Sequence, residues 1–212
     1  MTTVSSRMAA PTEPASTPVR EFRDLIGTFA TGVTVLTAGE PAHAHGMTAN
    51  AISSVSLEPR LVLACVSRTS AMITRLGKAG TRFILNILAH DQHELADRFS
   101  GRASSRPAIE LDPWMGGSRL VGGLAAIACD LDALHDGGDH RIVVGRVVAQ
   151  RREPKPRRPL IFYRGAYERL LAQPDMPGRT AAVRCGASPP QEKWTRARAV
   201  DAARDTSSAP IS

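Results

Sequence analysis

The sequence lacks most of the short motifs by which common enzyme classes are recognised. It has no GxGxxG or GxxxxGK[ST] motif, which argues against a Rossmann nucleotide site and a P-loop, and no GxSxG motif of a serine hydrolase. The segment that starts at His93 is similar to the HExxH motif of zinc proteases, but Asp97 replaces the second histidine. The sequence therefore gives little support for hydrolysis, and we expect no metal site.

Aromatic residues are also scarce, since the chain has only two Trp, two Tyr and five Phe. The net charge of +7 and a pI near 10.1 would suit a nucleic-acid partner. However, five basic residues crowd into the Pro-broken segment 151–158, and others are scattered through the C-terminal tail. Without aromatic residues between them, these residues form no base-stacking platform. We therefore expect no nucleic-acid partner.

The three cysteines, Cys65, Cys129 and Cys185, form no CxxC pair, and the first two lie within apolar segments. Isolated thiols of this kind are typical of a reducing compartment. No apolar run approaches the roughly 18 residues of a membrane-spanning helix, and the N-terminus lacks the apolar centre of a signal peptide. We therefore expect a cytoplasmic protein without a membrane partner.

Composition divides the chain into three parts. Residues 1–16 are rich in Ser, Thr, Pro and Ala, and residues 172–212 are rich in Pro, Ala, Arg and Ser. Both segments have few large apolar side chains to offset the entropy of ordering, so we expect both to be disordered. The intervening residues 17–171 have the length of one domain.

The apolar pattern of residues 17–171 predicts a mainly β domain with short helices. Thr17 and Pro18 are typical of a helix start, and four apolar residues at helical spacing predict a buried stripe. These four residues are Val19, Phe22, Ile26 and Phe29. We expect a hairpin of residues 124–135 and 141–152, one last strand over 159–167, and a long loop over 100–119. The lack of a regular βαβ alternation favours an antiparallel barrel over a doubly wound sheet.

The most informative segment runs from Gly46 to Pro59, where small side chains predominate and five residues carry a hydroxyl or an amide. Such a backbone can approach a ligand closely and present neutral hydrogen-bonding groups to it. Neutral groups of this kind suit a phosphate and a flat heterocycle. The segment therefore predicts a site for a nucleotide-like cofactor rather than a charged catalytic dyad.

Two further segments allow two interpretations each. In Gly137 to His140, either the glycines and Asp139 simply form a turn, or the acid orients the His140 ring for function. In Phe162 to Tyr167, the aromatic residues either lie in an edge strand with an interfacial Tyr pair or belong to a nucleotide site. In the second case Arg164 would meet a pyrophosphate and a Tyr would stack on a base.

Seven segments, taken in order, resemble the flavin reductase-like family over about Val19 to Leu170. They are F-A-T-G-V-T-V-L-T within Phe22 to Thr37, G-M-T-A-N-A-I-S-S-V-S-L-E-P (Gly46 to Pro59), L-V-L-A-C-V (Leu61 to Val66), F-I-L-N-I-L (Phe83 to Leu88), R-F-S-G (Arg98 to Gly101), G-G-D-H (Gly137 to His140) and P-L-I-F-Y-R-G-A-Y (Pro159 to Tyr167).

The resemblance implies a split β-barrel of the FMN-binding type that forms a homodimer with flavin in a cleft between the subunits. It implies an NAD(P)H:flavin oxidoreductase, which transfers a hydride from NADH or NADPH to FMN or FAD. The reduced flavin would then serve a partner component, a flavin-dependent monooxygenase. The alternatives are a flavoprotein that keeps its flavin and acts on a small organic substrate, or a non-catalytic flavin- or haem-binding sensor.

The resemblance also assigns the site residues by position. The flavin-binding residues would be Gly46, Met47, Thr48, Ala49, Asn50, Ala51, Ser53, Ser54, Cys65, Val66, Ser67, Ala71 and Met72, with Arg98 and Phe99 near the phosphate or adenylate end. His140, the candidate catalytic residue, and the turn Tyr163, Arg164 and Gly165 would hold the nicotinamide nucleotide. Two positions depart from the family pattern: Ala51 stands where Ser is common, and Arg60 where a second Pro is common.

Overall fold

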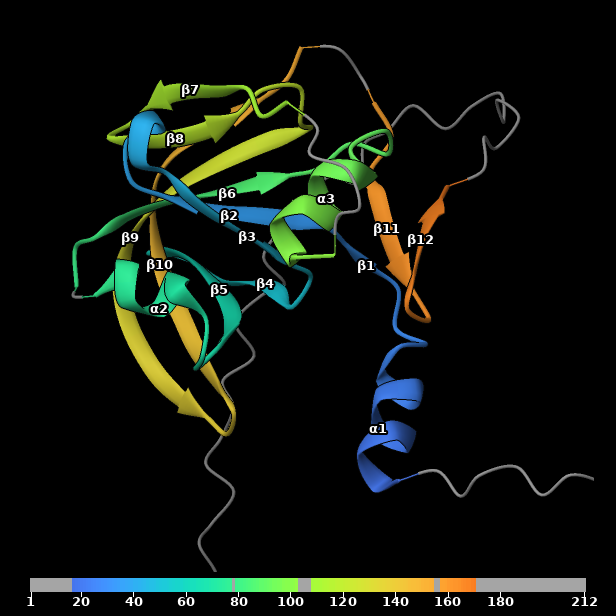
Figure 1. Cartoon of the computed structure of the whole chain (residues 1–212). Helices are drawn as coiled ribbons and strands as arrows, with labels where there is room; N and C mark the ends of the chain where they lie inside the picture. Colours follow the sequence, from blue (N-terminus) through green and yellow to red (C-terminus); the bar gives the residue numbers. More distant parts are fainter. Residues whose placement is uncertain (1–16, 78, 103–107, 155–156, 171–212) are drawn as a thin grey trace, which may run out of the picture. The chain divides into compact units, whose positions relative to one another are not determined.

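The computed structural model describes residues 17–77, 79–102, 108–154 and 157–170 (Figure 1). The segments that we expect to be disordered, 1–16 and 172–212, lie outside these residues. The described chain forms four helical segments and twelve strands. The helical segments are α1 (Pro18–Ile26), η1 (Pro41–His43), α2 (Ala71–Leu76) and α3 (His93–Ser100). The strands are β1 (Thr31–Gly32), β2 (Thr34–Ala38), β3 (His45–Ala49), β4 (Ile52–Leu57), β5 (Arg60–Ser67), β6 (Arg82–Ile87), β7 (Leu111–Trp114), β8 (Gly117–Leu120), β9 (Ala125–Gly137), β10 (His140–Arg152), β11 (Leu160–Tyr163) and β12 (Ala166–Arg169).

A seven-stranded sheet in the order β3-β2-β6-β9-β10-β5-β4 forms the body of the fold. Every neighbouring pair is antiparallel, as the absence of βαβ alternation predicts. The two longest strands, β9 and β10, form the predicted hairpin, and Gly138 has a positive φ of 71° in the turn between them. The sheet does not close, because its edge strands β3 and β4 each pair on one side only. The predicted split barrel is therefore confirmed.

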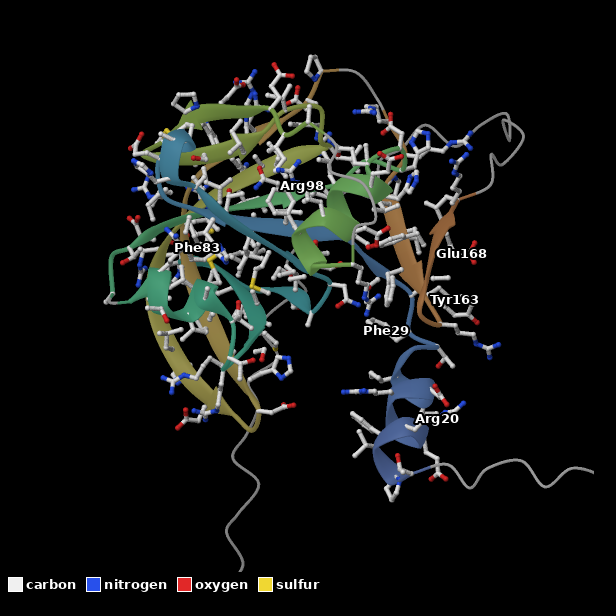
Figure 2. The ribbon with its side chains drawn as sticks, in the orientation of Figure 1. Arg20, Phe29, Phe83, Arg98, Tyr163 and Glu168 are labelled. Carbon is white, nitrogen blue, oxygen red and sulfur yellow. The ribbon has the colours of Figure 1, made fainter. Side chains whose placement is uncertain are left out.

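The main core lies inside the curved sheet and is built from alternate residues of its strands. Its largest side chain is Phe83 of β6, which is almost fully buried among Leu36, Leu85 and Leu131 (Figure 2). Gly145 of β10 lies against this ring at a β-bulge, and its lack of a side chain leaves room for Phe83. The barrel is therefore closely packed across its narrow dimension at Gly145.

A buried polar network joins the sheet to the β7–β8 hairpin. The amide of Asn86 donates to the Val35 carbonyl at 3.0 Å, and its oxygen accepts from the Leu120 amide at 2.8 Å. The hydroxyl of Ser118 donates to the Gly39 carbonyl at 2.6 Å. The expectation of a loop throughout 100–119 is therefore wrong, because its second half folds into β7 and most of β8, held by these hydrogen bonds.

The last predicted strand is in fact a hairpin. Residues 159–167 contain β11, a turn and the start of β12, and β11 pairs with β1 to complete a three-stranded sheet. The turn consists of Arg164 and Gly165, which have φ values of 48° and 82°. Phe162 and Tyr167 pack edge to face across the hairpin, with ring centroids 5.7 Å apart.

The first helix has the predicted start but not the predicted burial. Thr17 caps α1 by accepting from the Arg20 amide, but α1 ends at Ile26 with Gly27 as its C-cap, so Phe29, the last residue of the predicted stripe, lies beyond the helix. Phe22 is 65% exposed and Phe29, beyond the helix, is 71% exposed. The prediction that this apolar stripe is buried is therefore wrong within one chain, because no described element covers this face of the helix. Figure 1 shows α1 beyond β1, away from the barrel.

No helix in the described part of the chain is long and apolar enough to cross a membrane.

Replacing Gly145 with Ala tests the close packing inside the barrel. The added Cβ would lie 2.5 Å from Phe83 Cζ and 2.9 Å from Cys129 Cβ. We expect the free energy of unfolding, measured with urea, to fall by about 1–3 kcal/mol. Gly32→Ala is the control, because no atom lies within 4 Å of its Cβ position and its φ is not positive. Equal losses in the two variants would contradict this account of the core.

Candidate functional site

Strand β5 separates the core from a cavity, because its side chains alternate between the two faces of the sheet. Val62, Ala64 and Val66 are buried in the core. Leu63 and Cys65 point to the opposite face and line the cavity. The same strand therefore stabilises the barrel and forms the floor of the candidate site.

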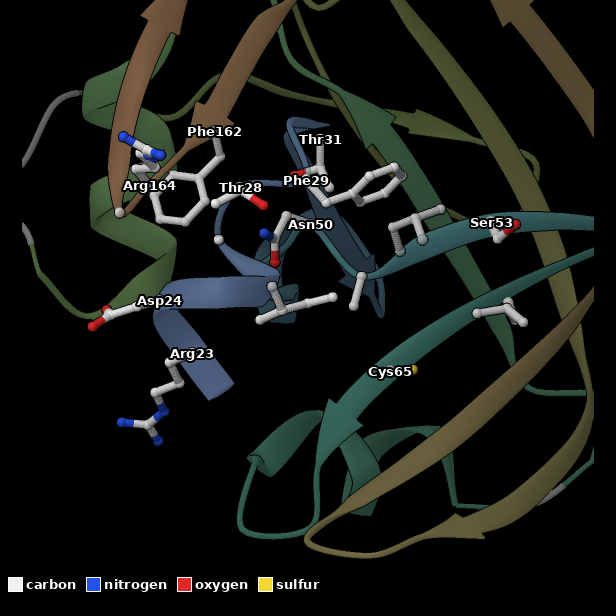
Figure 3. Close-up of a pocket in the computed structure, with 16 residues that line it drawn as sticks. Arg23, Asp24, Thr28, Phe29, Thr31, Asn50, Ser53, Cys65, Phe162 and Arg164 are labelled. Carbon is white, nitrogen blue, oxygen red and sulfur yellow. The ribbon is translucent and has the colours of Figure 1, made fainter. Parts of the chain in front are cut away.

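The cavity has a volume of about 900 Å³, which lies within the usual range for small-molecule and cofactor sites. One wall is the main chain and small side chains of residues 50–53 (Figure 3). The opposite wall is the C-terminal end of α1 and residues 27–31, which Figure 3 shows facing Asn50. Phe162 and the turn at Arg164 close the third side. The site therefore joins four segments that are far apart in the sequence.

The lining is mostly apolar, with a few polar groups around it. Thr31 Oγ1 is buried and has no hydrogen-bond partner within the described chain, and Asn50 presents an exposed amide. Two cations, Arg23 and Arg164, lie at the cavity, as does Asp24, whose carboxylate lies 3.9 Å from Arg20 Nε. An apolar slot with neutral donors and nearby cations fits a flat heterocycle that carries a phosphate.

The turn that carries Arg164 is fixed against the end of α1. The Arg164 amide donates to the Gly27 carbonyl at 2.8 Å, and the guanidinium lies 5.4 Å from the ring centroid of Tyr163. The α1 wall is therefore attached to the cavity through its C-terminal end.

Six of the residues expected at the site line the cavity. They are Asn50, Ala51, Ser53, Cys65, Arg164 and Gly165. Asn50 and Ala51 lie in the short connection between β3 and β4, and the Cys65 amide donates to the Ala51 carbonyl at 2.9 Å. This hydrogen bond holds the small-residue segment against β5, where the sequence suggested close approach of the backbone to a ligand.

Other expected residues support the site without lining the cavity. Val66 and Met72 are fully buried in the core, so only their main-chain atoms are available to a ligand. The Thr48 hydroxyl donates to the Ala96 carbonyl of α3 at 2.6 Å. Met47 accepts from the Ser70 hydroxyl, which also caps α2. These contacts attach β3 to both flanking helices.

The remaining expected residues lie around these elements. A side chain at Gly46 would overlap the Phe99 ring, so the glycine allows α3 to pack closely on β3. Arg98 lies within the same helix, and Ala49 is buried at the end of β3. The other four lie at the ends or edges of elements: Ser54 in the edge strand β4, Ser67 at the end of β5, Ala71 at the start of α2, and Tyr163 at the end of β11.

His140 lies on the same face of the sheet as the cavity. It pairs with Ser67 at the end of the β5–β10 ladder, and directly opposed residues point to the same face. Since Ser67 is two residues beyond Cys65, His140 is about 7 Å further along the strand direction. Its Nδ1 is 2.7 Å from Asp139 Oδ1, and this hydrogen bond lowers the pKa of Asp139. The acid therefore orients the ring, as one of the two sequence interpretations required.

Several lining residues were missed by the sequence interpretation. Arg23, Asp24, Thr28 and Thr31 all come from the first helix or the segment after it. The apolar spacing of this segment indicated core packing, so no polar site residues were sought there. Phe162 was not among the predicted site residues, although its ring lies at the cavity (Figure 3).

No group of three or more His, Cys, Asp or Glu side chains among the described residues is arranged to hold a metal ion.

An open antiparallel barrel with a mostly apolar cavity of about 900 Å³ beside a small-residue segment is the architecture of a split-barrel flavin-binding protein. The family model for the flavin reductase like domain matches residues 26–171. The chain belongs to this family.

The curated relatives and solved structures agree with this membership. The reductase subunit HsaB of a flavin-dependent monooxygenase from Rhodococcus jostii is 39% identical over 70% of this chain and 76% of its own length. An NADH-dependent flavin reductase from a Rhodococcus species is 38% identical over 74% of this chain and 89% of its own length. The NADH:FAD oxidoreductase SgcE6 of Streptomyces globisporus, solved with NAD and FAD fragments, is 32% identical, with a TM-score of 0.67 over 77% of this chain and 99% of that chain.

Thiol labelling tests whether the cavity binds flavin. Cys65 lines the cavity, whereas Cys129 is fully buried, and burial raises the pKa of its thiol to about 12. In a Cys185→Ser variant at pH 8, we expect iodoacetamide to modify Cys65 about tenfold faster or more than Cys129. Saturating FMN or FAD should slow the modification of Cys65 severalfold, as read by peptide mass spectrometry.

Labelling of Cys129 gives the control, because the core does not change when a ligand enters the cavity. An unchanged rate at Cys65 under saturating FMN and saturating FAD would place the flavin elsewhere.

Proposed function

We propose that this chain is the NAD(P)H-dependent flavin reductase component of a two-component flavin-dependent monooxygenase. It transfers a hydride from NADH or NADPH to FMN or FAD, and the reduced flavin serves the partner component. The observation that carries the proposal is the cavity between residues 50–53 and α1, with Cys65 on its floor and His140 on the same face of the sheet.

The chemistry needs binding and orientation more than acid–base catalysis. A bound flavin accepts the hydride of the nicotinamide ring with its two electrons, and no protein base is required for that transfer. The residues at the cavity therefore bind and orient the two ligands. Asn50 and Ser53 offer neutral hydrogen-bonding groups to the polar edge of the ring, and the small side chain of Ala51 leaves its face free. Arg23 and Arg164 supply positive charge for phosphates.

His140 positions the nicotinamide or its carboxamide. Asp139 holds the imidazole at Nδ1, which leaves Nε2 as the ring atom directed to a ligand. His140 lies at the end of the β5–β10 ladder, so it is beside the proposed flavin site and does not line it. We therefore assign the nicotinamide to His140 and the flavin ring to residues 50–53.

The flavin is an exchangeable substrate or a loosely held cofactor. The walls around the proposed ring position are mostly apolar, and the two cations, Arg23 and Arg164, are assigned to the phosphate rather than to the ring, which favours release of reduced flavin to a partner. A protein of this kind works in the reducing cytoplasm, which is consistent with the two free thiols Cys65 and Cys129.

Steady-state oxidation of NADH and NADPH, each with riboflavin, FMN and FAD, tests the proposed function. We expect oxidation of the nicotinamide nucleotide only when free flavin is added, with initial rates that saturate in both substrates. Rapid turnover of a flavin that does not exchange would favour a flavoprotein that acts on its own organic substrate. A bound flavin that NADH and NADPH fail to bleach would favour a sensor and contradict the proposal.

The exposed apolar face of α1 supports a homodimer. Phe22, Leu25 and Ile26 are all more than half exposed, and Phe29 continues this face toward the cavity. A nine-residue helix is marginal in water without packing, so this face requires a covering surface. The edge strand β4 also exposes Val55 and Leu57. A second copy that covers these apolar groups would complete the α1 wall of the cavity.

Replacing Phe22 with Asp tests this assembly. We expect wild-type protein to be a dimer by light scattering, and Phe22→Asp to weaken association about tenfold or more by placing a charge in the apolar contact. Arg20→Ala on the polar face of the same helix is the control and should remain dimeric. A monomeric wild-type protein, or a Phe22→Asp variant that associates normally, would contradict the role of α1.

A further inference from the structure

The turn that carries His140 is held by one arginine from another strand. Arg68 follows directly after β5, and its side chain crosses to the tip of the β9–β10 hairpin. Its Nε donates to the Gly138 carbonyl at 2.6 Å, and its Nη2 lies 2.8 Å from Asp136 Oδ1. Its main-chain amide donates to the Asp139 carbonyl at 3.0 Å. Arg68 therefore contacts the end of β9 and both residues of the turn through three separate donors, two of them in its side chain.

Apart from the β9–β10 ladder, which runs up to Gly137 and His140, and the ion pair of Arg141 with Asp136, little else among the described contacts holds this turn. Gly137, Gly138 and Asp139 are exposed, and the ladder between β5 and β10 ends at the pair Ser67 and His140. The last pair of a ladder opens more readily than the interior pairs, because only one neighbouring pair supports it. Arg68 hydrogen-bonds to Gly138 and Asp139, one residue beyond the last pair of the ladder, so it limits movement of the turn relative to β5.

The charges at the turn favour the same arrangement. Asp136 accepts from Arg68 and from Arg141 Nη1, which lies 2.6 Å from the same carboxylate oxygen. Exposed ion pairs contribute little to stability, and Asp136 is largely exposed. The combined contacts of Arg68 therefore matter for the position of the turn more than for the stability of the whole domain.

The fixed turn determines where the His140 ring lies. Asp139 orients the imidazole, and the Arg68 side chain holds the carbonyl of the preceding residue, Gly138. We propose that Arg68 is a positioning residue for the nicotinamide nucleotide, which acts by holding the turn of His140 and Asp139 beside β5. The inference rests on the proposed function, in which His140 contacts the nucleotide.

Steady-state kinetics of four variants test this inference. They are Arg68→Ala, His140→Ala, the double variant, and the control Arg146→Ala. Arg146 is also an exposed arginine paired with a carboxylate on the β9–β10 hairpin, but its partner Asp132 lies away from the turn. We expect Arg68→Ala to raise the NADH KM about three- to tenfold, with the flavin KM and kcat nearly unchanged. Arg146→Ala should change none of these values.

The double variant shows whether Arg68 acts through His140. If it does, adding Arg68→Ala to His140→Ala should raise the NADH KM by less than twofold, because the two effects are not additive. Arg68→Lys should restore part of the loss, since an ammonium can donate to Gly138 or Asp136 but lacks the planar fork of Arg68. If Arg68→Ala folds poorly, Asp136→Ala removes one acceptor of the Arg68 side chain and should give a smaller increase of the same kind.

The outcomes separate the two hypotheses. An unchanged NADH KM in His140→Ala, in an enzyme that still reduces flavin, would reject the role of His140 and with it this inference. A raised NADH KM in His140→Ala but not in Arg68→Ala would reject the role of Arg68 alone. Equal rises in the NADH and flavin KM values of Arg68→Ala, or full additivity with His140→Ala, would show a general structural role and overturn the inference.

Discussion

The register of β5 between its two neighbours is the constraint on which the rest of the site depends. On one side, the Cys65 amide bonds to the Ala51 carbonyl and holds the small-residue segment in place. On the other side, Ser67 pairs with His140. A shift of one residue would turn Cys65 into the core and Val66 toward the cavity, so the buried side chains of β5 strongly fix this register. Core packing thereby aligns the two halves of the site.

The arrangement explains how a protein without a charged catalytic dyad can serve redox chemistry. The cavity offers shape, neutral groups and nearby cations, whereas the reactivity belongs to the two cofactors. In the proposed function, the flavin ring contacts residues between 50 and 65, and the group assigned to the nucleotide lies at the hairpin tip. The two ligands would then be bound by different elements, which meet along a single strand, and their affinities would be controlled separately.

Sequence reasoning predicted features that depend on local chemistry and missed those that depend on distant contacts. The helix start at Thr17 and the β9–β10 hairpin follow from short-range patterns, and the structure has them. The burial of α1 depends on what lies opposite it, which spacing alone cannot show. For the site, six of the predicted residues line the cavity, but alternation along β5 separates Cys65 from Val66 only once the core face is known. The contribution of Arg23 required the position of α1, which no motif encodes.

A crystal structure of the protein soaked with FMN and FAD is the most direct test of the central claim. The account predicts density for the isoalloxazine ring against Asn50, Ala51 and Cys65, with its phosphate toward Arg23 or Arg164. The ring should leave one face open on the side of His140. Density for the ring on any other surface, or a cavity without a ring at saturating concentrations of both flavins, would contradict it.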